Sequence, residues 1–481
     1  MSSSAHTGGS YLAIDLGASS GRAVVGTLAG AVMSMDEVHR FPTPMIECDG
    51  HLSWDVDAMW ADIRKGIANA LDAGHRLRSV SVDSWAVDYV PLDKQGTALR
   101  RPYSYRDPRT TGRMETVIAL AGGARALYDR TGIQFLPFNT LPQIVADVHD
   151  EPELVAKTAT RLLIAEYFLY RMCGRKVAEA TMASTTQLVD VRTGQWSHHL
   201  LNAIGDDEKR WPEIVQPGTS LGPVLPGVAP TGDHAPLVIA TCAHDTAAAV
   251  AAVPANANRA WAFISSGTWS LVGAELTAPI LTDDARKSGF TNEAGIDGTV
   301  RFLKNRAGMW VVEELRREWE SRGERPSHDE LVKGAASAAS LGITVNLNAS
   351  EFAERGGMAQ KLDAACLAKG VDAPAATGGY VRLVLESLAS SHAHALDQLA
   401  SVTGSRADDI HIVGGGARND LLNQLTADRT GCRVLAGPEE ATVLGNLLVQ
   451  ARALGDLPIG VSIREAARCS SHVREFTPLS S

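Results

Sequence analysis

The residue best suited to chemistry in this sequence is Asp245, within residues 240–253, ATCAHDTAAAVAAV. The apolar, β-branched run 237–240 predicts a buried strand, and the alanine-rich run after Thr246 predicts a tightly packed helix. Asp245 would then lie at a turn from strand to helix, where its carboxylate can face a pocket and accept a proton from a bound hydroxyl group. The alternative is that Asp245 only caps the helix, because Asp is a favoured N-cap residue.

A second chemical signal is the segment 11–27, YLAIDLGASSGRAVVGT, in which a turn rich in glycine and serine separates two apolar runs. Small residues let backbone N–H groups approach a phosphate, and Arg22 adds a positive charge. Asp15, at the end of the first run, is well placed to hold Mg²⁺, usually through water. The alternative is an ordinary hairpin. Because the sequence has no GxxxxGK[ST] motif, ATP would not be bound through a P-loop helix.

Two further segments combine strands with residues that can contact a ligand. In residues 78–96, which predict strand, turn and strand, Trp85 could form a pocket wall and Asp83 and Asp88 could accept hydrogen bonds from a polyol; alternatively, Trp85 belongs to the core. Residues 410–436 predict a strand, three consecutive glycines, a helix 421–430 with Asp420 as its N-cap, and a strand. Bare backbone at the glycines would suit a flat ring or a phosphate, or simply a tight crossover.

The elements that must position these residues repeat half a chain apart. Aligning Gly17 with Gly267 places the hairpin pattern of residues 11–27 against residues 261–275, WAFISSGTWSLVGAE. This spacing predicts an internal duplication with two similar α/β domains, unless the likeness of the hairpins is due to chance. Ser265 replaces Asp15 in the second copy, so its turn would be a neutral phosphate-contacting loop. Residues 254–258 are the best candidate for the boundary between the domains.

Composition excludes several classes of protein. A chain of 481 residues with 45% hydrophobic and 21% charged residues is expected to form two or more globular domains. The opening segment, MSSSAHTGGS, lacks the features of a signal peptide and no apolar run is long enough to span a membrane, so the expected location is the cytoplasm. Six scattered cysteines predict free thiols rather than disulfides or a zinc site, and a net charge of −10 disfavours nucleic acid as a partner.

Together, the motifs resemble those of the FGGY carbohydrate kinases. The resemblance extends from about Tyr11 to about Val449, and it is carried in order by DLGASSGR (15–22), SWAVD (84–88), YRDPRT (105–110), GIQFLPFNTL (132–141), AHDTAAAV (243–250), SSGTWSL (265–271) and HIVGGGARN (411–419). It implies an α/β fold of two ribonuclease-H-like domains of the sugar kinase, Hsp70 and actin superfamily, with an interdomain cleft for ATP and a ketose. The expected domains are residues 9–252, for the sugar, phosphates and metal, and residues 253–475, for the nucleotide.

The resemblance also implies a role for individual residues. Asp245 would be the catalytic base and Asp15 the Mg²⁺ site. Residues around the sugar would be Ala86, His244, Asp245, Thr246 and Asn305. Residues around ATP would be Ala18, Ser19, Ser20, Gly21, Arg22, Thr268, Glu313 and Gly415. Two of these positions depart from the pattern of the most similar members: Ala86 replaces a glycine, which preserves a backbone N–H contact if its φ is negative, and Glu313 replaces a glutamine.

Within the family, the motifs are most similar to those of kinases that phosphorylate L-rhamnulose at the 1-hydroxyl. Two alternatives remain. A kinase for another ketose, such as L-fuculose or xylulose, would share the ATP site and differ in the sugar pocket. A non-catalytic, ATP-driven binding module of the same superfamily would need neither a base near the sugar nor the SWAVD segment. The expected partners are therefore a small ketose and ATP, and neither nucleic acid nor a membrane.

Overall fold

The computed structural model describes residues 9–229, 235–256 and 258–479. Residues 1–8 of the opening segment and Ala257 of the candidate boundary lie outside this description. The chain divides into two compact units, each assembled from separate segments. The first contains the chain up to Pro254, Glu275–Phe302 and Ala441–Ser470, and the second contains Ala255–Ala274, Leu303–Glu440 and Ser471–Ser481.

The first unit is built on a six-stranded sheet with the order β13-β14-β6-β1-β2-β3. Its strands are β1 (Ser10–Leu16), β2 (Ser20–Ala29), β3 (Val32–Pro42), β6 (Leu77–Ser84), β13 (Thr219–Pro223) and β14 (Leu237–Ala240). Strands β1, β6 and β14 run parallel, whereas β2, β3 and β13 are antiparallel to their neighbours. The expected hairpin at residues 11–27 is therefore present as β1 and β2.

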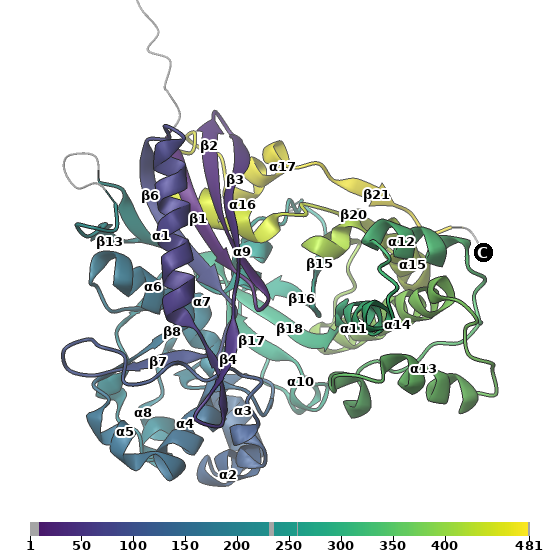
Figure 1. The fold of residues 1–481 in the computed structure, drawn as a ribbon, viewed down its shortest axis with the longest axis horizontal. Coiled ribbons are helices and arrows are strands. Elements are labelled where there is room, and N and C mark those ends of the chain that lie inside the picture. Colours follow the sequence, from purple (N-terminus) through teal and green to yellow (C-terminus); the bar gives the residue numbers. More distant parts are fainter. Residues whose placement is uncertain (1–8, 230–234, 257, 480–481) are drawn as a thin grey trace, which may run out of the picture. The chain divides into compact units, whose positions relative to one another are not determined.

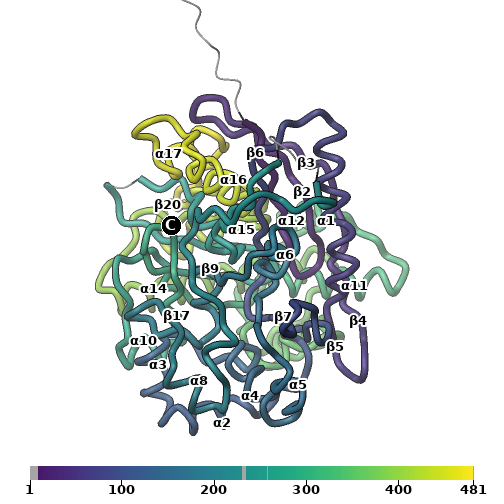
Figure 2. The backbone as a smooth tube through the Cα atoms, turned by 90° about the vertical axis from the view of Figure 1, so that its left-hand side faces the viewer, coloured from purple at the N-terminus to yellow at the C-terminus, as the bar shows by residue number. Residues whose placement is uncertain are grey.

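Both faces of this sheet are covered, so β1 is buried along its whole length. Alternate residues of a strand point to opposite faces. Leu12, Ile14 and Leu16 pack in the core that includes α1 (Val56–Asp72) and α6 (Ile164–Cys173). Tyr11 and Ala13 pack in the core of α9 (Asp245–Ala251) and α16 (Ala441–Ala453). Figures 1 and 2 show the purple strands between α1 and the yellow α16, which comes from the far end of the sequence.

The alanine-rich helix α9 packs closely against α16, as its sequence predicts. Ala247, Ala248 and Ala251 are all buried in this contact. On the side of α16, a Cβ atom placed on Gly445 would lie only 1.9 Å from the carbonyl oxygen of Ala248. Small residues on both helices are therefore what allows the two backbones to meet.

The remaining elements of the first unit surround this sheet and extend beyond it. Its other strands are β4 (Met45–Cys48), β5 (His51–Trp54), β7 (Tyr89–Leu92), β8 (Thr160–Leu163), β9 (Ala178–Glu179), β10 (Val189–Asp190), β11 (Gln195–Trp196), β12 (Ile214–Val215) and β17 (Thr291–Ala294). Its other helices are α2 (Arg113–Leu120), α3 (Ala124–Thr131), α4 (Thr140–Asp150), α5 (Pro152–Lys157), α7 (Ala180–Ala183), α8 (His198–Ala203), α10 (Asp283–Lys287) and α17 (Ile463–Ser470).

The second sheet repeats the strand order of the first, so the expected duplication is confirmed. Its strands, in spatial order, are β17 (Thr291–Ala294), β18 (Val300–Ala307), β16 (Trp269–Leu276), β15 (Trp261–Ser266), β19 (Asp409–Val413), β20 (Arg433–Ala436) and β21 (Arg474–Phe476), and β17 is an edge strand with no counterpart in the first sheet. The pair β15 and β16 is antiparallel like β1 and β2, and β15, β19 and β20 run parallel like β1, β6 and β14. This is the repeated α/β topology expected of two ribonuclease-H-like domains.

Helices of the second unit cover this sheet and form a separate core. They are α11 (Trp310–Ser321), α12 (His328–Ser337), α13 (Met358–Leu367), α14 (Thr377–Thr403) and α15 (Asp420–Thr430). The prediction that Asp420 caps α15 is wrong: the cap is Asn419, whose side chain accepts a hydrogen bond from the N–H of Leu422 at 3.0 Å. Among the described residues, no helix has both the length and the apolar surface needed to cross a membrane.

Candidate active site

Three segments far apart in the sequence meet at the carboxyl ends of the parallel strands β1, β6 and β14. The N–H of Ser84 donates to the carbonyl of Ala243 at 2.9 Å, and the N–H of Trp85 donates to that of Leu16 at 3.3 Å. These bonds bring together the chain after Asp15, the start of the SWAVD segment and the turn before Asp245. Ligands of open α/β sheets bind at this end of the strands.

Asp245 is the first residue of α9, and His244 occupies the N-cap position. The Oδ1 of Asp245 accepts hydrogen bonds from the N–H and the Oγ1 of Thr246, the latter at 3.0 Å. The Nε2 of His244 lies 3.4 Å from the same oxygen, and one third of the Asp245 side chain is exposed. Because these contacts all involve Oδ1, Oδ2 is the oxygen available to a ligand. The alternative role of Asp245, as the cap of the helix, is not what the structure shows.

The environment of Asp245 also favours a proton acceptor. Burial raises the pKa of its carboxyl group above the ordinary value, the neighbouring His244 lowers it in part, and the negative charge of Asp15 raises it further. A base works best when its pKa approaches the operating pH. The direction of the shift is therefore the one that a general base requires.

Asp15 is paired with Arg22 across the hairpin. The Nη2 and Nε atoms of Arg22 donate to Asp15 Oδ2 at 2.7 and 3.0 Å. Between them, the turn brings Ser19 and Ser20 to the surface and leaves Ala18 half-buried, whereas Gly21 is buried. A Cβ on Gly21 would lie 2.5 Å from the ring of Phe41, so this glycine is required by packing.

Asp83 lies directly beside Asp15, because the two residues are paired in the register of β6 and β1. It is completely buried, and its Oδ2 accepts a hydrogen bond from the side chain of Asn446 at 2.6 Å. Its Oδ1 is buried without a protein partner. Burial, and then the charge of Asp15, raise the pKa of Asp83 well above its ordinary value.

The SWAVD segment is a turn held by protein contacts. Asp88 accepts hydrogen bonds from the indoles of Trp54 and Trp85 at 2.7 and 3.0 Å, and further bonds come from Gln143 and the N–H of Tyr105. These donors occupy both oxygens, so the prediction that Asp88 binds a polyol is wrong. Trp85 is 6% exposed and packs in the core, as the alternative held.

The backbone strain of this turn falls on Val87 rather than on Ala86. Val87 has a φ of 73°, which is a rare conformation for a β-branched residue, whereas Ala86 is not among the described residues with a positive φ. The carbonyl of Val87 is held by Thr140 Oγ1 at 2.7 Å and by Gln143 Nε2 at 3.3 Å. Ala86 therefore meets the condition of a φ outside the positive region, and its contact with the sugar stays a prediction.

Two buried glutamates that the sequence analysis missed support the turn before Asp245. Glu179 is fully buried and accepts hydrogen bonds from the N–H of Thr181 at 3.0 Å and of Ala243 at 2.9 Å. The backbone N–H of Glu179 in turn donates to Glu166 Oε1 at 3.0 Å. No local sequence pattern marks this role, since the bonds that join Glu179 to Glu166 and to Ala243 span 13 and 64 positions.

The buried carboxyl group of Glu166 predicts that the stability of the protein depends on pH. Burial raises the pKa of Glu166 from its ordinary 4.5 to about 8, an effect that hydrogen bonds from backbone N–H groups reduce and the charge of Glu179 increases. The folded protein therefore binds a proton that the unfolded chain releases, and the stability from this group is lost as the pH rises from about 4.5 to about 8. Glu166→Gln cannot titrate, so we expect its free energy of unfolding, relative to the unmodified protein, to rise by a few kcal/mol at most between pH 5 and pH 9. Urea unfolding of both proteins measures this difference, and a difference independent of pH would contradict it.

Of the residues expected around ATP, Thr268, Glu313 and Gly415 lie in the second unit, and so does Asn305, which is expected near the sugar. Thr268 is exposed in the turn between β15 and β16. The carbonyl groups of Gly267 and Thr268 accept hydrogen bonds from the N–H groups of Met309 and Trp310, at 2.9 and 3.2 Å. Asn305 is half-buried in β18. The start of α11 therefore fixes the second turn.

The three consecutive glycines, residues 414–416, allow close packing on β15 and also leave backbone open to a ligand. A Cβ on Gly416 would lie 1.9 Å from Ser266 Oγ, so a side chain there would collide with β15. Gly415, by contrast, is exposed, and its Cβ would meet nothing within 4 Å. Glu313 is half-buried on α11, where it lies 3.1 Å from Arg316 and 3.4 Å from His328. Of these residues, Gly415 offers the open backbone surface that a ring or phosphate could approach.

Neither thiols nor histidines form a metal centre in the described part of the chain. All six cysteines are free, as expected, and no group of three or more His, Cys, Asp or Glu side chains there could hold a metal by itself. His392 is buried between Ser270 and Thr426, and burial lowers its pKa to about 4, whereas His394 is exposed. Any metal bound near Asp15 would need ligands from water or substrate.

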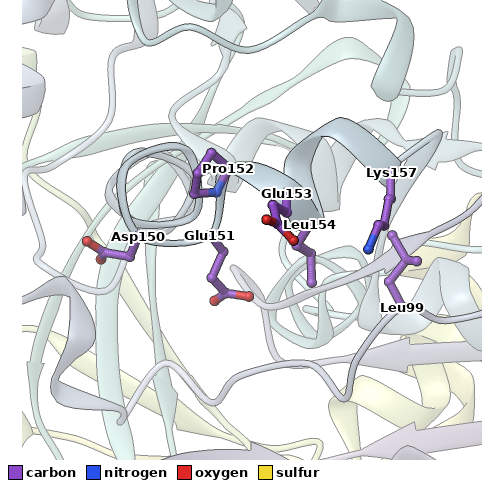
Figure 3. Close-up of a pocket in the computed structure, with 7 residues that line it drawn as sticks. All are labelled: Leu99, Asp150, Glu151, Pro152, Glu153, Leu154 and Lys157. Carbon is purple, nitrogen blue, oxygen red and sulfur yellow. The ribbon is translucent and has the colours of Figure 1, made fainter.

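One pocket of the first unit, of about 540 Å³, is lined by none of these residues. It is formed by the end of α4 and by α5 (Figure 3), and its lining is Leu99, Asp150, Glu151, Pro152, Glu153, Leu154 and Lys157. Two of its carboxylates are paired with arginines: Asp150 with Arg113 at 2.7 Å and Glu151 with Arg100 at 3.5 Å. We therefore assign the chemistry to the strand ends rather than to this pocket.

Comparison with known proteins identifies the family of the chain. The model of the N-terminal domain of the FGGY family of carbohydrate kinases matches residues 10–252, and that of the C-terminal domain matches residues 262–454. A rhamnulokinase of Bacillus subtilis strain 168 is 39% identical over 469 residues, covering 97% of this chain and 95% of that protein. A rhamnulokinase of Bacteroides thetaiotaomicron is 37% identical over 469 residues, covering 97% of this chain and 96% of its own.

Solved structures support the fold. A gluconate kinase of Lactobacillus acidophilus superposes with a TM-score of 0.79 at 15% identity, covering 98% of this chain and 94% of the other. A xylulose kinase of Rhodospirillum rubrum has a TM-score of 0.76 at 17% identity, with the same coverage of both chains. At such identities the likeness concerns the fold alone.

Proposed function

We propose, because the chain belongs to the FGGY family of carbohydrate kinases, that it transfers the γ-phosphoryl group of ATP to the 1-hydroxyl of L-rhamnulose. The observation that carries this proposal is the Asp245 carboxylate at the carboxyl ends of β1, β6 and β14, with Oδ2 available and Asp15 nearby. The similarity to rhamnulokinases over 97% of the chain supports the choice of sugar.

In the proposed reaction, Asp245 accepts the proton of the sugar hydroxyl while the hydroxyl oxygen attacks the γ-phosphorus of ATP. The bond between that phosphorus and the β,γ-bridging oxygen breaks, and ADP leaves with the electron pair. Such reactions depend on the positioning of the reactants and on stabilisation of charge on the transferred group. Around the sugar, we assign Ala86, His244, Thr246 and Asn305. Around the phosphates, we assign Ala18, Ser19, Ser20, Gly21, Arg22 and Thr268.

The residues near Asp15 fit a magnesium ion. Mg²⁺ prefers oxygen ligands, keeps several waters and is completed by phosphate oxygens, so one or two carboxylates are enough. Asp15 is such a carboxylate, and the buried Oδ1 of Asp83 beside it lacks a protein partner. We therefore propose that Asp15 holds Mg²⁺, usually through water. When bound, the ion would neutralise charge on the phosphates. For the adenosine we propose the exposed backbone at Gly415 as the binding surface, and the predicted contact of Glu313 with the nucleotide stays a prediction.

Turnover on a panel of sugars tests the proposed function. We expect ADP release, measured with a coupled assay, to have its highest kcat/KM with L-rhamnulose among L-rhamnulose, L-fuculose, xylulose and glycerol. A higher value for another ketose would leave the reaction class intact but show that the sugar is wrong. ADP release that no sugar stimulates would favour an ATP-driven binding module.

Asp15→Asn tests the metal site. If Asp15 orients the water around Mg²⁺, its loss should raise the Mg²⁺ concentration for half-maximal activity on the order of 10- to 100-fold, the usual effect of an outer-shell partner. The measurement is a Mg²⁺ titration of ADP release at saturating sugar. Asp62→Asn, which removes a carboxylate paired with His39 at 2.8 Å, is the control. An unchanged Mg²⁺ dependence in Asp15→Asn would remove Asp15 from the metal site.

A further inference from the structure

A buried ion pair contacts the ring of His244 and takes no part in the proposed reaction. Glu293 in β17 and Arg301 in β18 approach to 3.0 Å between Oε2 and Nη2. Arg301 is completely buried, and its Nε donates to the carbonyl of Ala294 at 3.0 Å. Removing an arginine from water is costly, and a counter-ion repays that cost only when the geometry of the pair is good. A pair of this kind beside the active site therefore needs a reason.

Both members of the pair face one nitrogen of the His244 ring. Arg301 Nη2 lies 3.1 Å from Nδ1, in hydrogen-bond geometry, and Glu293 Oε2 lies 3.4 Å from it. A guanidinium group has only donors, so Nδ1 must be the acceptor. The neutral ring then carries its proton on Nε2. Nε2 in turn lies 3.4 Å from Asp245 Oδ1.

We propose that Arg301 and Glu293 are positioning residues that hold His244 as the neutral Nε2–H tautomer, so that the ring donates to Asp245. This inference rests on the proposed function, in which Asp245 is the base. A donor directed at Oδ1, together with Thr246, fixes the carboxylate and leaves Oδ2 to the sugar hydroxyl. The opposite tautomer would direct a lone pair of the ring at the carboxylate.

Glu293 neutralises the buried positive charge of Arg301. Burial alone would raise the pKa of its carboxyl group, but the charge of Arg301 holds it below the ordinary value, so the pair is ionised. Without Arg301, the Glu293 carboxylate would be the group nearest to Nδ1 and would accept a proton from it. Arg301 therefore selects the Nε2–H tautomer of His244 by donating to Nδ1. Glu293 compensates the charge of the buried Arg301.

The ¹⁵N chemical shifts of the histidine ring test this directly in the full-length protein labelled with [¹⁵N]histidine, with His244→Asn to assign the signals. We expect the unmodified protein to show a neutral ring protonated on Nε2. Arg301→Met should move a proton to Nδ1, whereas Arg301→Lys and Glu293→Gln, which retain a donor at position 301, should keep Nε2–H. A ring protonated on Nδ1 in the unmodified protein, or unchanged shifts in Arg301→Met, would overturn the proposal.

A matched control separates positioning from stability. Arg161 is also completely buried and paired with Asp206 at 2.7 Å, but it does not contact His244. Arg161→Met should therefore destabilise the protein while leaving the His244 signals unchanged. Should Arg301→Met fail to fold, the double variant Arg301→Met with Glu293→Met removes both charges, and it should also lose the single Nε2–H tautomer. Retention of that tautomer in the double variant would overturn the proposal.

Kinetics supply the second readout. Per folded molecule, Arg301→Met should lower kcat on the order of 10- to 100-fold, less than the loss of the base itself, with the KM for ATP unchanged. Arg301→Lys should recover most of this loss, and Arg161→Met should show none. A fall in kcat equal to that of Arg161→Met would mean that Arg301 is only structural. If no sugar is phosphorylated by the unmodified protein, the proposed function fails, whereas the ring signals still test the tautomer.

Discussion

Asp245→Asn should lower kcat by a factor on the order of 10² to 10⁴, which is the usual contribution of a general base. The amide has nearly the shape of the carboxylate but cannot take the proton of the sugar hydroxyl. The hydrogen bonds from Thr246 end on Oδ1, which the amide can still offer as its carbonyl oxygen, so the fold should be retained. Steady-state ADP release with L-rhamnulose, together with nucleotide affinity by calorimetry, measures both consequences.

The control is another carboxylate at the start of a helix. Asp55 is the N-cap of α1, where it accepts a hydrogen bond from the N–H of Ala58 at 3.2 Å. Asn is an equally good N-cap, so Asp55→Asn should leave both activity and stability nearly unchanged. Turnover close to normal in Asp245→Asn would show that Asp245 is not the base.

Gly445→Ala should be strongly destabilising although it adds a single methyl group. The new Cβ would lie 1.9 Å from the Ala248 carbonyl oxygen and 2.6 Å from the Ala248 carbonyl carbon, and a backbone atom cannot move aside as a side chain can. Helices α9 and α16 must separate, and we expect a loss of about 3 kcal/mol or more in the free energy of unfolding. Because α9 begins with Asp245, kcat should also fall. Urea unfolding and ADP release measure the two effects.

Gly334 provides the matched control. It also lies inside a helix, α12, but a Cβ there would be 3.4 Å from the nearest atom, the Cα of Gly378, which is an ordinary contact. Gly334→Ala should therefore be neutral or stabilising by up to about 1 kcal/mol, the difference in helix propensity. Equal effects of the two substitutions would contradict the close packing of α9 on α16.

The sequence was sufficient to identify the fold class and the strand ends that carry Asp15 and Asp245. Both residues follow short apolar runs, and the repeat of the hairpin half a chain later reveals the duplication that the two sheets confirm. The alanines after Asp245 indicated tight packing, but not the partner. That partner, α16, returns from nearly two hundred residues later, and no local pattern encodes such a contact.

The residues that were missed or misjudged depend on long-range contacts. Asp88 looks like a ligand residue in its motif, but the indoles of Trp54 and Trp85 occupy it. Glu293 and Arg301 lie in strand patterns where charged residues usually face solvent, yet Arg301 is completely buried. Asp420 was expected to cap α15 because Asp is a favoured cap, but the neighbouring Asn419 is as well suited and lies one position earlier.

The phosphorylated product formed from ATP and L-rhamnulose tests the central claim most directly. In L-rhamnulose, C1 carries two hydrogen atoms, whereas each other carbon with a free hydroxyl group carries at most one. The ³¹P NMR signal of a 1-phosphate should therefore be split into a triplet by the two C1 protons, and its amount should equal the ADP released. We predict this triplet with the unmodified protein and its near absence over the same time with Asp245→Asn. A doublet, or inorganic phosphate in place of a sugar phosphate, would contradict the account.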